Sequence, residues 1–93
     1  MKKCLKIVLG IDVPEGFLHS SVQKHARSFD IEGTAQIIMT EKQVRIIACG
    51  KKDKVDDFID TLHKDFAKAK ITDFEIEPFL KDRDYRGVFR IIE

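Results

Sequence analysis

One segment sets the architecture of this chain: GIDVPEGFLHSSVQKHARSFDIEG, residues 10–33. It begins with a loop that two glycines close, Gly10 and Gly16. After the loop, apolar residues recur at the spacing that lines one face of a helix over residues 18–29: Leu18, Val22, Ala26 and Phe29. An apolar run precedes the loop, so the order is strand, loop, helix, which commonly presents backbone N–H groups to an anion.

The flanking segments supply the remaining elements. Asp53 is predicted as the N-cap of a second helix, whose apolar face carries Val55, Phe58, Leu62 and Phe66. A polar hairpin turn is expected over residues 40–42. Apolar patterns predict strands over residues 4–9, 34–39, 44–49 and 70–77, with a short terminal strand over residues 88–92.

The order of elements is therefore strand, helix, strand, strand, helix, strand, followed by the short extra strand. Two strand–helix–strand units that share one sheet predict an α+β fold, the ferredoxin-like plait, with an antiparallel sheet and both helices on one face. The 93 residues can bury one modest core and not two, so residues 1–93 are expected to form a single domain.

Charge is balanced along the chain. The 17 Lys and Arg against 16 Asp and Glu give a formal net charge of +1. No block of like charge is long, so a solvated mixed surface is expected, with no nucleic-acid partner. The apolar run near the amino terminus is too short for the apolar region of a signal peptide or for a membrane span. We therefore expect a soluble, cytoplasmic monomer that binds no membrane.

The two cysteines, Cys4 and Cys49, are too few for a disulfide scaffold and too far apart for a paired zinc motif. In the predicted plait the first and third strands are antiparallel neighbours, so the two residues lie side by side on the face away from the helices. A cross-strand disulfide is geometrically allowed there. Two free thiols are favoured in a reducing cytoplasm, and both interpretations stay open.

The pattern of glycines and apolar residues resembles the acylphosphatase family over nearly the whole chain. The matching motifs are Gly10-x5-Gly16-Phe17, Ala26-x2-Phe29-x3-Gly33, Val44-x-Ile46-x-Ala48-Cys49-Gly50, Phe58-x3-Leu62 and Ala69-x-Ile71. The resemblance implies the same plait, hydrolysis of the carboxyl–phosphate bond of small acyl phosphates, and no metal or cofactor. It also implies an anion-binding loop, made here of Gly10, Ile11, Asp12, Val13, Pro14, Glu15, Gly16, Phe17 and Leu18.

Two family residues that carry the chemistry are missing from this chain. An arginine of the family's loop holds the phosphate; aligning the loop on its glycines places Leu18 there, whereas the helix register, which we prefer, places His19 there. The family's asparagine, which orients the attacking water, aligns with Ile37, whose side chain neither donates nor accepts a hydrogen bond. His19 is therefore the candidate for a remaining catalytic contact, and Ile37 is not expected to function.

The loop itself is predicted to be a poor cradle for phosphate. Pro14 lacks a backbone N–H, and Asp12 and Glu15 place negative charge beside the expected position of a dianion. A histidine offers one donor, whereas an arginine fork binds phosphate through two charge-assisted hydrogen bonds. Lys24 or Arg27 of the first helix is the alternative source of a cation.

The other candidate residues are weaker. His25 and His63 are predicted on exposed polar helix faces, and no pair of histidines or cysteines has the spacing of metal ligands. A basic cluster precedes the last strand: Lys81, Arg83, Tyr85 and Arg86. It is interpreted as a solvated loop, because the open sheet face lacks the paired aromatics of RNA-binding plaits and carries instead Lys6, Val8, Arg45 and Ile47.

Three hypotheses remain. The favoured one is an acylphosphatase-like domain that has lost most of its activity and persists as a small binding or regulatory protein. Its partner is then a small acyl phosphate, an inorganic anion or an unidentified protein. The second is a functional acylphosphatase rebuilt around His19 and the loop amides of residues 10–16. The third is a nucleic-acid-binding plait.

Overall fold

The computed structural model describes residues 2–14, 16–80 and 85–92 of the chain. A wide helical turn, η1, runs directly into the first α-helix, α1, so the two form the one continuous helix that the apolar spacing predicts. In chain order the elements are β1 (Lys2–Gly10), η1 (Leu18–Gln23), α1 (Lys24–Ser28), β2 (Glu32–Ile38), β3 (Gln43–Lys51), α2 (Lys52–Lys68), β4 (Phe74–Pro78) and β5 (Phe89–Ile92).

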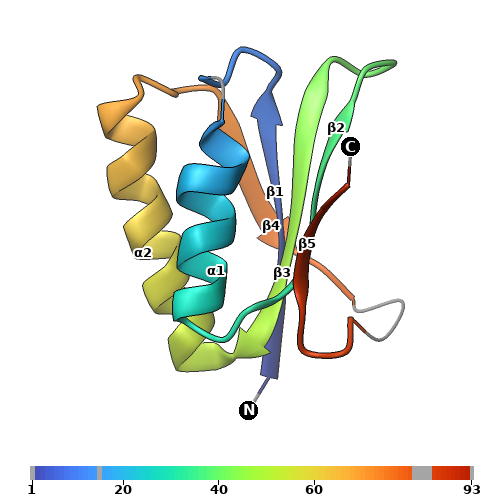
Figure 1. Ribbon diagram of the computed structural model, residues 1–93, viewed down its shortest axis with the longest axis vertical. Helices are drawn as coiled ribbons and strands as arrows, with labels where there is room; N and C mark the ends of the chain where they lie inside the picture. The colour runs from blue at the N-terminus through green and yellow to red at the C-terminus, as the bar shows by residue number, and fades with distance from the viewer. Residues whose placement is uncertain (1, 15, 81–84, 93) are drawn as a thin grey trace.

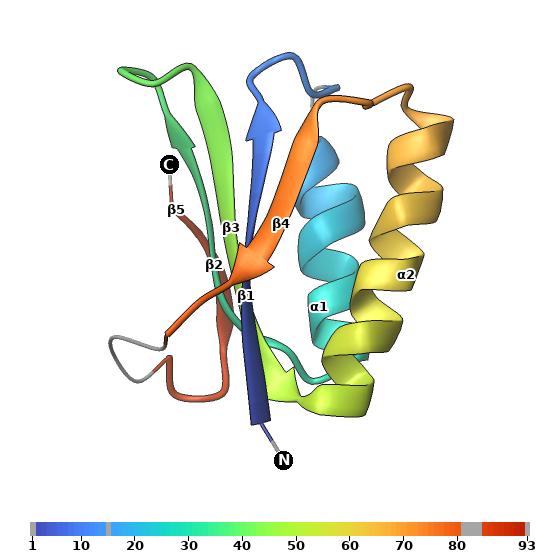
Figure 2. The same cartoon turned by 180° about the vertical axis from the view of Figure 1, so that it is seen from behind.

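The strands form one sheet in the order β4-β1-β3-β2-β5, with both helices on one face (Figure 1). β1 pairs antiparallel with β3 and β4, and β2 pairs antiparallel with β3, as expected for the plait. The prediction of a wholly antiparallel sheet is wrong for β5, which pairs parallel with β2. The reason is the path of the chain, because β4 ends and β5 begins at the end of the sheet where β2 begins (Figure 2).

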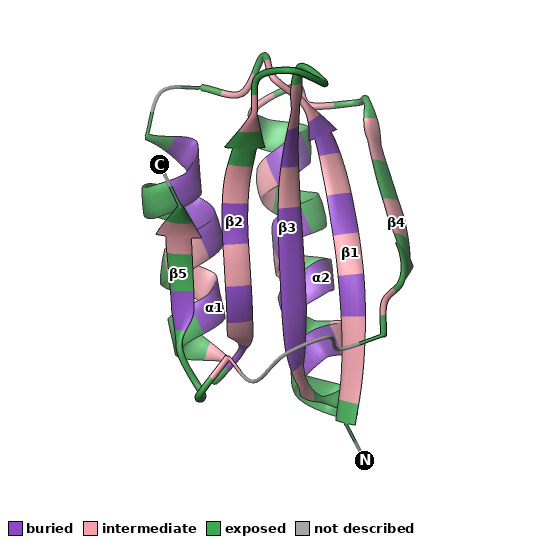
Figure 3. Ribbon diagram, turned by 90° about the vertical axis from the view of Figure 1, so that its right-hand side faces the viewer, coloured by how far each residue is buried: buried purple, intermediate pink, exposed green. Residues whose placement is uncertain are grey.

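The core lies between the sheet and the two helices. In β1, every second side chain faces the helices, and Leu5, Ile7 and Leu9 are buried there while their neighbours are partly exposed. Figure 3 shows a similar alternation on β2, whereas β3 is buried without interruption over residues 46–49. The helices bury their apolar stripes against this face, mainly through Val22, Ala26, Phe58, Leu62 and Phe66.

A glycine allows the central strands to approach closely. Gly33 in β2 has a φ of 145°, and a Cβ added there would overlap the backbone carbonyl oxygen of Ile47 in β3. Any other residue would push β2 away from β3 or twist the strand out of register. The sheet therefore requires a glycine at position 33 for steric reasons.

The carboxyl end of α2 explains why β4 is shorter than predicted. Lys70 adopts a left-handed φ of 59°, and the N–H of Ile71 donates to the carbonyl of Phe66 at 2.8 Å. The residues that follow α2 thus form its terminating turn. The strand begins at Phe74 rather than at residue 70.

The amino end of α2 also differs from the prediction. The N-cap is Lys51, which makes no side-chain capping hydrogen bond, so the assignment of Asp53 as the cap is wrong. Asp53 lies in the first turn of the helix. Its negative charge there stabilises the helix, because it lies near the positive end of the helix dipole. In a sequence, an acidic residue in the first turn of a helix therefore looks like an N-cap residue.

The face of the sheet away from the helices is partly covered. Ile47 and Cys49 of β3 point to this face, yet only 5% and 2% of their surfaces are exposed. Where the chain leaves β4, the N–H of Phe79 donates to the carbonyl of Cys4 at 3.1 Å. Among residues 2–14, 16–80 and 85–92, no helix combines the length and the apolar character needed to cross a membrane.

Candidate functional site

The loop between β1 and η1 is shaped by its own short-range hydrogen bonds. The N–H of Val13 donates to the carbonyl of Ile11 at 2.8 Å, and that of Phe17 donates to Pro14 at 3.0 Å. Gly16 adopts a φ of 77°, which lets the chain turn into the helix. The N–H of Ser20 then donates to the carbonyl of Gly16 at 2.8 Å and closes the first helical turn.

These bonds reduce what the loop can offer to a ligand. The N–H groups of Val13 and Phe17 are already engaged within the loop, and Pro14 has none. A phosphate dianion needs several converging donors in a site from which water is excluded. That this loop is a poor phosphate cradle stays a prediction.

A hollow of about 280 Å³ lies beside the loop and brings both predicted chemical positions together. Its walls come from the loop, the start of η1, the end of β2 and the end of β5. His19 and Ile37 are both among its lining residues, and among the residues that the structure describes there, His19 carries the only polar side chain. The described lining residues are Ile11, Val13, Pro14, Gly16, Phe17, Leu18, His19, Ile37, Ile91 and Ile92.

Some of the predicted loop residues lie elsewhere. Gly10 and Asp12 line a separate depression with Lys70 and Asp73, on the side of the loop that meets β4. Glu15 lies outside the described residues. Within the part of the chain that the structure describes, neither residue 12 nor any other acidic residue lines the 280 Å³ hollow.

The two candidate cations of the first helix are not found in the described wall of the hollow. Lys24 and Arg27 are exposed, and neither is among the described residues that line the hollow.

Sequence reasoning missed the contribution of β5, whose Ile91 and Ile92 form part of the wall. Only the parallel pairing of β5 with β2 brings these residues beside Ile37, and the apolar spacing of the last strand carries no signal of that pairing.

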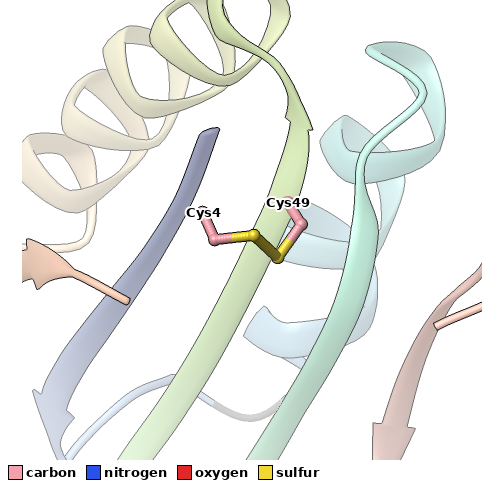
Figure 4. Close-up of a disulfide and its surroundings, with 2 residues drawn as sticks. All are labelled: Cys4 and Cys49. Carbon is pink, nitrogen blue, oxygen red and sulfur yellow. A yellow bond between two sulfur atoms is a disulfide. The ribbon is translucent and has the colours of Figure 1, made fainter. Parts of the chain in front are cut away.

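The two cysteines lie at the opposite end of β1. Cys4 and Cys49 are directly paired in the register of β1 and β3, with their Cα atoms 4.1 Å apart, and a disulfide joins them (Figure 4). The neighbour relation predicted from the plait is therefore confirmed, and the structure contains a bridge instead of two free thiols. Six residues of extended strand separate Cys4 from Gly10, which is about 20 Å, so the disulfide takes no part in the hollow.

A polar contact that the sequence did not reveal joins the two helices. The Ser21 hydroxyl donates to Asp65 Oδ2 at 2.5 Å, and His25 Nε2 lies 2.8 Å from the same oxygen. The hydrogen bond from Ser21, and then the contact with His25, hold the pKa of the Asp65 carboxyl below its ordinary value. His25 is therefore half-buried and paired, contrary to the predicted exposed position. The sequence signal for this contact is the i,i+4 spacing of Ser21 and His25, which places both residues on one face of the helix.

Two cations of the open sheet face lie beside acidic side chains. Lys6 Nζ lies 2.7 Å from Glu77 Oε1, and Arg45 contacts Glu41 at 3.4 Å, so each of these two cations is paired with an acid. Tyr85 and Arg86 line a hollow of about 360 Å³ at β2 and β5. Lys81 and Arg83 lie outside the described residues. Among the residues that the structure describes, no group of three His, Cys, Asp or Glu residues could hold a metal ion.

Comparison with known proteins identifies the family. A sequence model of the acylphosphatase family matches residues 7–91. The chain belongs to the acylphosphatase family. A search of curated proteins finds no match to the sequence.

Solved structures support the acylphosphatase fold. An acylphosphatase from Coxiella burnetii aligns with a TM-score of 0.76 and 21% identity over 98% of this chain and 93% of that one. An acylphosphatase from Bacillus subtilis aligns with a TM-score of 0.77 and 19% identity over the full length of both. HypF from T. kodakarensis aligns with a TM-score of 0.72 and 18% identity over all of this chain but only 12% of its own length.

Proposed function

We propose that this acylphosphatase-family domain has lost most or all hydrolysis of acyl phosphates and serves as a small binding or regulatory protein. The observation that carries the proposal is the lining of the loop hollow. His19 and Ile37, the positions that the family resemblance equates with the arginine and the asparagine, both face this hollow without a guanidinium or an amide. Losing one electrostatic contact of this kind costs about a hundredfold or more in rate, and here two groups are absent.

The test is to restore the two missing groups. The double variant His19→Arg, Ile37→Asn is assayed for hydrolysis of benzoyl phosphate against the wild type. Its matched control is His63→Arg, Met39→Asn, because both control residues are exposed and neither lines the hollow. We expect at least a tenfold gain for the first double variant and no gain for the control. Equal rates for the two would contradict the roles assigned to positions 19 and 37.

The competing function is an enzyme rebuilt around His19. It is favoured by one observation, since His19 is the polar side chain of the hollow. In that case the wild type turns over benzoyl phosphate at a rate close to that of an intact family member, and His19→Ala abolishes the activity. Under our proposal the wild type is nearly inactive, and His19→Ala changes little.

The cytoplasmic location and the absence of a nucleic-acid partner remain predictions. The disulfide bears on the first, because such bridges persist mainly in oxidising compartments. Thiol labelling of the protein as extracted from its cells distinguishes the disulfide from two free thiols. The paired cations Lys6 and Arg45 support the second, and retention on immobilised RNA as the salt concentration rises measures it.

A further inference from the structure

The two halves of the disulfide differ in exposure. Cys4 is half-buried, whereas only 2% of the surface of Cys49 is exposed. Both side chains lie on the face of the sheet away from the helices, where the bridge joins the neighbouring strands β1 and β3 (Figure 4). The rate at which an external thiolate opens a disulfide depends on which sulfur it can reach. Cys4 is therefore the half of the bridge that is open to attack.

The part of β1 that carries Cys4 is paired less completely than the rest of the strand. Among the residues that the structure describes, β4 pairs with residues 5–9 of β1 and not with residues 2–4. On the other side, β3 pairs with β1 along its whole length. A segment paired on one side opens more readily than one paired on both sides. The bridge therefore reinforces the less paired end of β1.

Two further contacts reach this end of the strand. The N–H of Phe79, beyond β4, donates one hydrogen bond to the carbonyl of Cys4 at 3.1 Å. Lys3 Nζ lies 2.9 Å from Asp56 Oδ1 of α2, but both side chains are partly exposed, and such ion pairs contribute little to stability. Neither contact replaces a paired strand, so the disulfide is the main tie on residues 2–4 besides β3.

The fold keeps the two cysteines together without the bridge. They are directly opposite in the register of β1 and β3, with their Cα atoms 4.1 Å apart. The buried cluster between the sheet and the helices contains neither Cys4 nor Cys49. We therefore expect the reduced protein to stay folded with its thiols side by side, so that closing the bridge again is an intramolecular step. The sequence has two cysteines, so no wrong pairing can form within the chain.

We propose that the bridge between Cys4 and Cys49 is a site of thiol–disulfide exchange, at which a dithiol reductant opens a covalent tie on residues 2–4 and an oxidising disulfide closes it. The redox state of the surroundings then sets how firmly this end of β1 is held. The site lies at the opposite end of β1 from the loop hollow, so its tests are independent of hydrolysis and of any ligand bound there.

The exchange proceeds in two steps that balance. A thiolate of the reductant attacks Cys4 Sγ, and the electron pair of the S–S bond leaves with Cys49 Sγ, which takes up a proton. The second thiolate of the reductant then attacks the reductant's own sulfur in the mixed disulfide, and Cys4 leaves as a thiolate and takes up a proton. The bridge has gained two electrons and two protons, and the dithiol has lost them and become a disulfide.

The first test follows the opening of the bridge in the wild-type protein. Dithiothreitol is added under native conditions, the thiols are alkylated with iodoacetamide after set times, and mass spectrometry counts them. We expect full opening while the amide spectrum of the sheet is retained, at a rate that low urea concentrations leave unchanged, and closure with oxidised glutathione. A rate that rises with urea as steeply as global unfolding would overturn the proposal, because the bridge would then open only in the unfolded chain.

A matched pair of variants tests the direction of attack. Cys49→Ala leaves the Cys4 thiol alone, and Cys4→Ala leaves the Cys49 thiol alone. We expect the first variant to react with dithiobis(nitrobenzoate) about tenfold faster than the second under native conditions, and both to react at the same rate in urea. Equal rates under both conditions would overturn the assignment of Cys4 as the attacked sulfur. The wild-type test does not depend on the folding of either variant.

The tie on residues 2–4 is measured by backbone order parameters from NMR relaxation of the oxidised and the reduced protein. We expect the values at residues 3–4 to fall from about 0.85 towards about 0.6 on reduction. Residues 7–8, which have a paired strand on both sides, should stay at about 0.85. The double variant Cys4→Ala, Cys49→Ala is the control and should not respond to dithiothreitol. Unchanged order parameters at residues 3–4 of the wild type would overturn the proposed tie.

Discussion

The two ends of β1 are held in different ways. At one end, Cys4 is bridged to Cys49 and hydrogen-bonded to the chain that leaves β4. At the other end, Gly10 leads into a loop whose described backbone hydrogen bonds are mostly short-range, beside a hollow that is open to solvent. The disulfide and the start of the loop beside the proposed ligand site are therefore about 20 Å apart. We therefore expect substitutions at the loop end to affect the proposed site without removing the disulfide that joins β1 and β3.

Breaking the disulfide should have the largest effect on stability. The bridge spans a sequence separation of 45, for which the chain-entropy relation gives about 4 kcal/mol of stabilisation. We expect Cys4→Ala, Cys49→Ala to lower the free energy of unfolding in urea by about this amount. Amide shifts around the hollow should stay unchanged. A loss below about 1 kcal/mol, or perturbed amides at residues 16–19, would contradict the separation of the two ends.

Gly33 in the sheet and Gly16 in the loop allow a second comparison, because both have a positive φ. Gly33→Ala would force a Cβ against the Ile47 carbonyl, whereas Gly16→Ala meets nothing within 4 Å. We expect Gly33→Ala to cost about 3 kcal/mol and Gly16→Ala about 1 kcal/mol, the cost of the left-handed backbone alone. Thermal unfolding of both variants measures the difference. Equal costs would show that the close approach of β2 and β3 is not a constraint.

The contact between the helices should have a smaller effect that depends on pH. Asp65→Asn weakens the hydrogen bonds to Ser21 and His25, and we expect a loss of about 1–2 kcal/mol near pH 7. Asp60→Asn, at an exposed position of α2, is the matched control and should cost nothing measurable.

The sign of the pH dependence follows from the pKa of Asp65. The folded protein holds this pKa below its ordinary value of 3.8, so near pH 4 the unfolded chain binds more protons than the folded one. The wild type should therefore lose stability as the pH falls from about 5 towards the folded pKa, and Asp65→Asn should lose less over the same range. Urea unfolding at a series of pH values measures both curves. Parallel curves would contradict the role of this carboxylate.

Most of the fold was predictable because each element carries a local signal. The stripe from Leu18 to Phe29 and the alternation in β1 gave the helix faces and the buried side of the sheet. The direction of β5 was not predictable, since it depends on where the chain crosses the sheet after β4 and not on the residues of the strand. Register was predictable where the plait fixes it, as for Cys4 opposite Cys49.

The site was predictable only in part. The helix register placed His19 and Ile37 at positions that the structure brings into one hollow. The apolar character of the hollow depends also on Ile91 and Ile92, which come from a strand whose pairing was not foreseen. The contact between Ser21 and Asp65 joins residues 44 apart in sequence, and only the packing of the two helices brings them together.

We propose above all that an acylphosphatase fold here encloses a site without the groups for hydrolysis. The most direct measurement is kcat/KM for benzoyl phosphate, taken for this protein and for the Bacillus subtilis acylphosphatase under the same conditions. The loss of two electrostatic contacts predicts a value at least about a thousandfold lower for this chain. A value within tenfold of that enzyme would contradict the account.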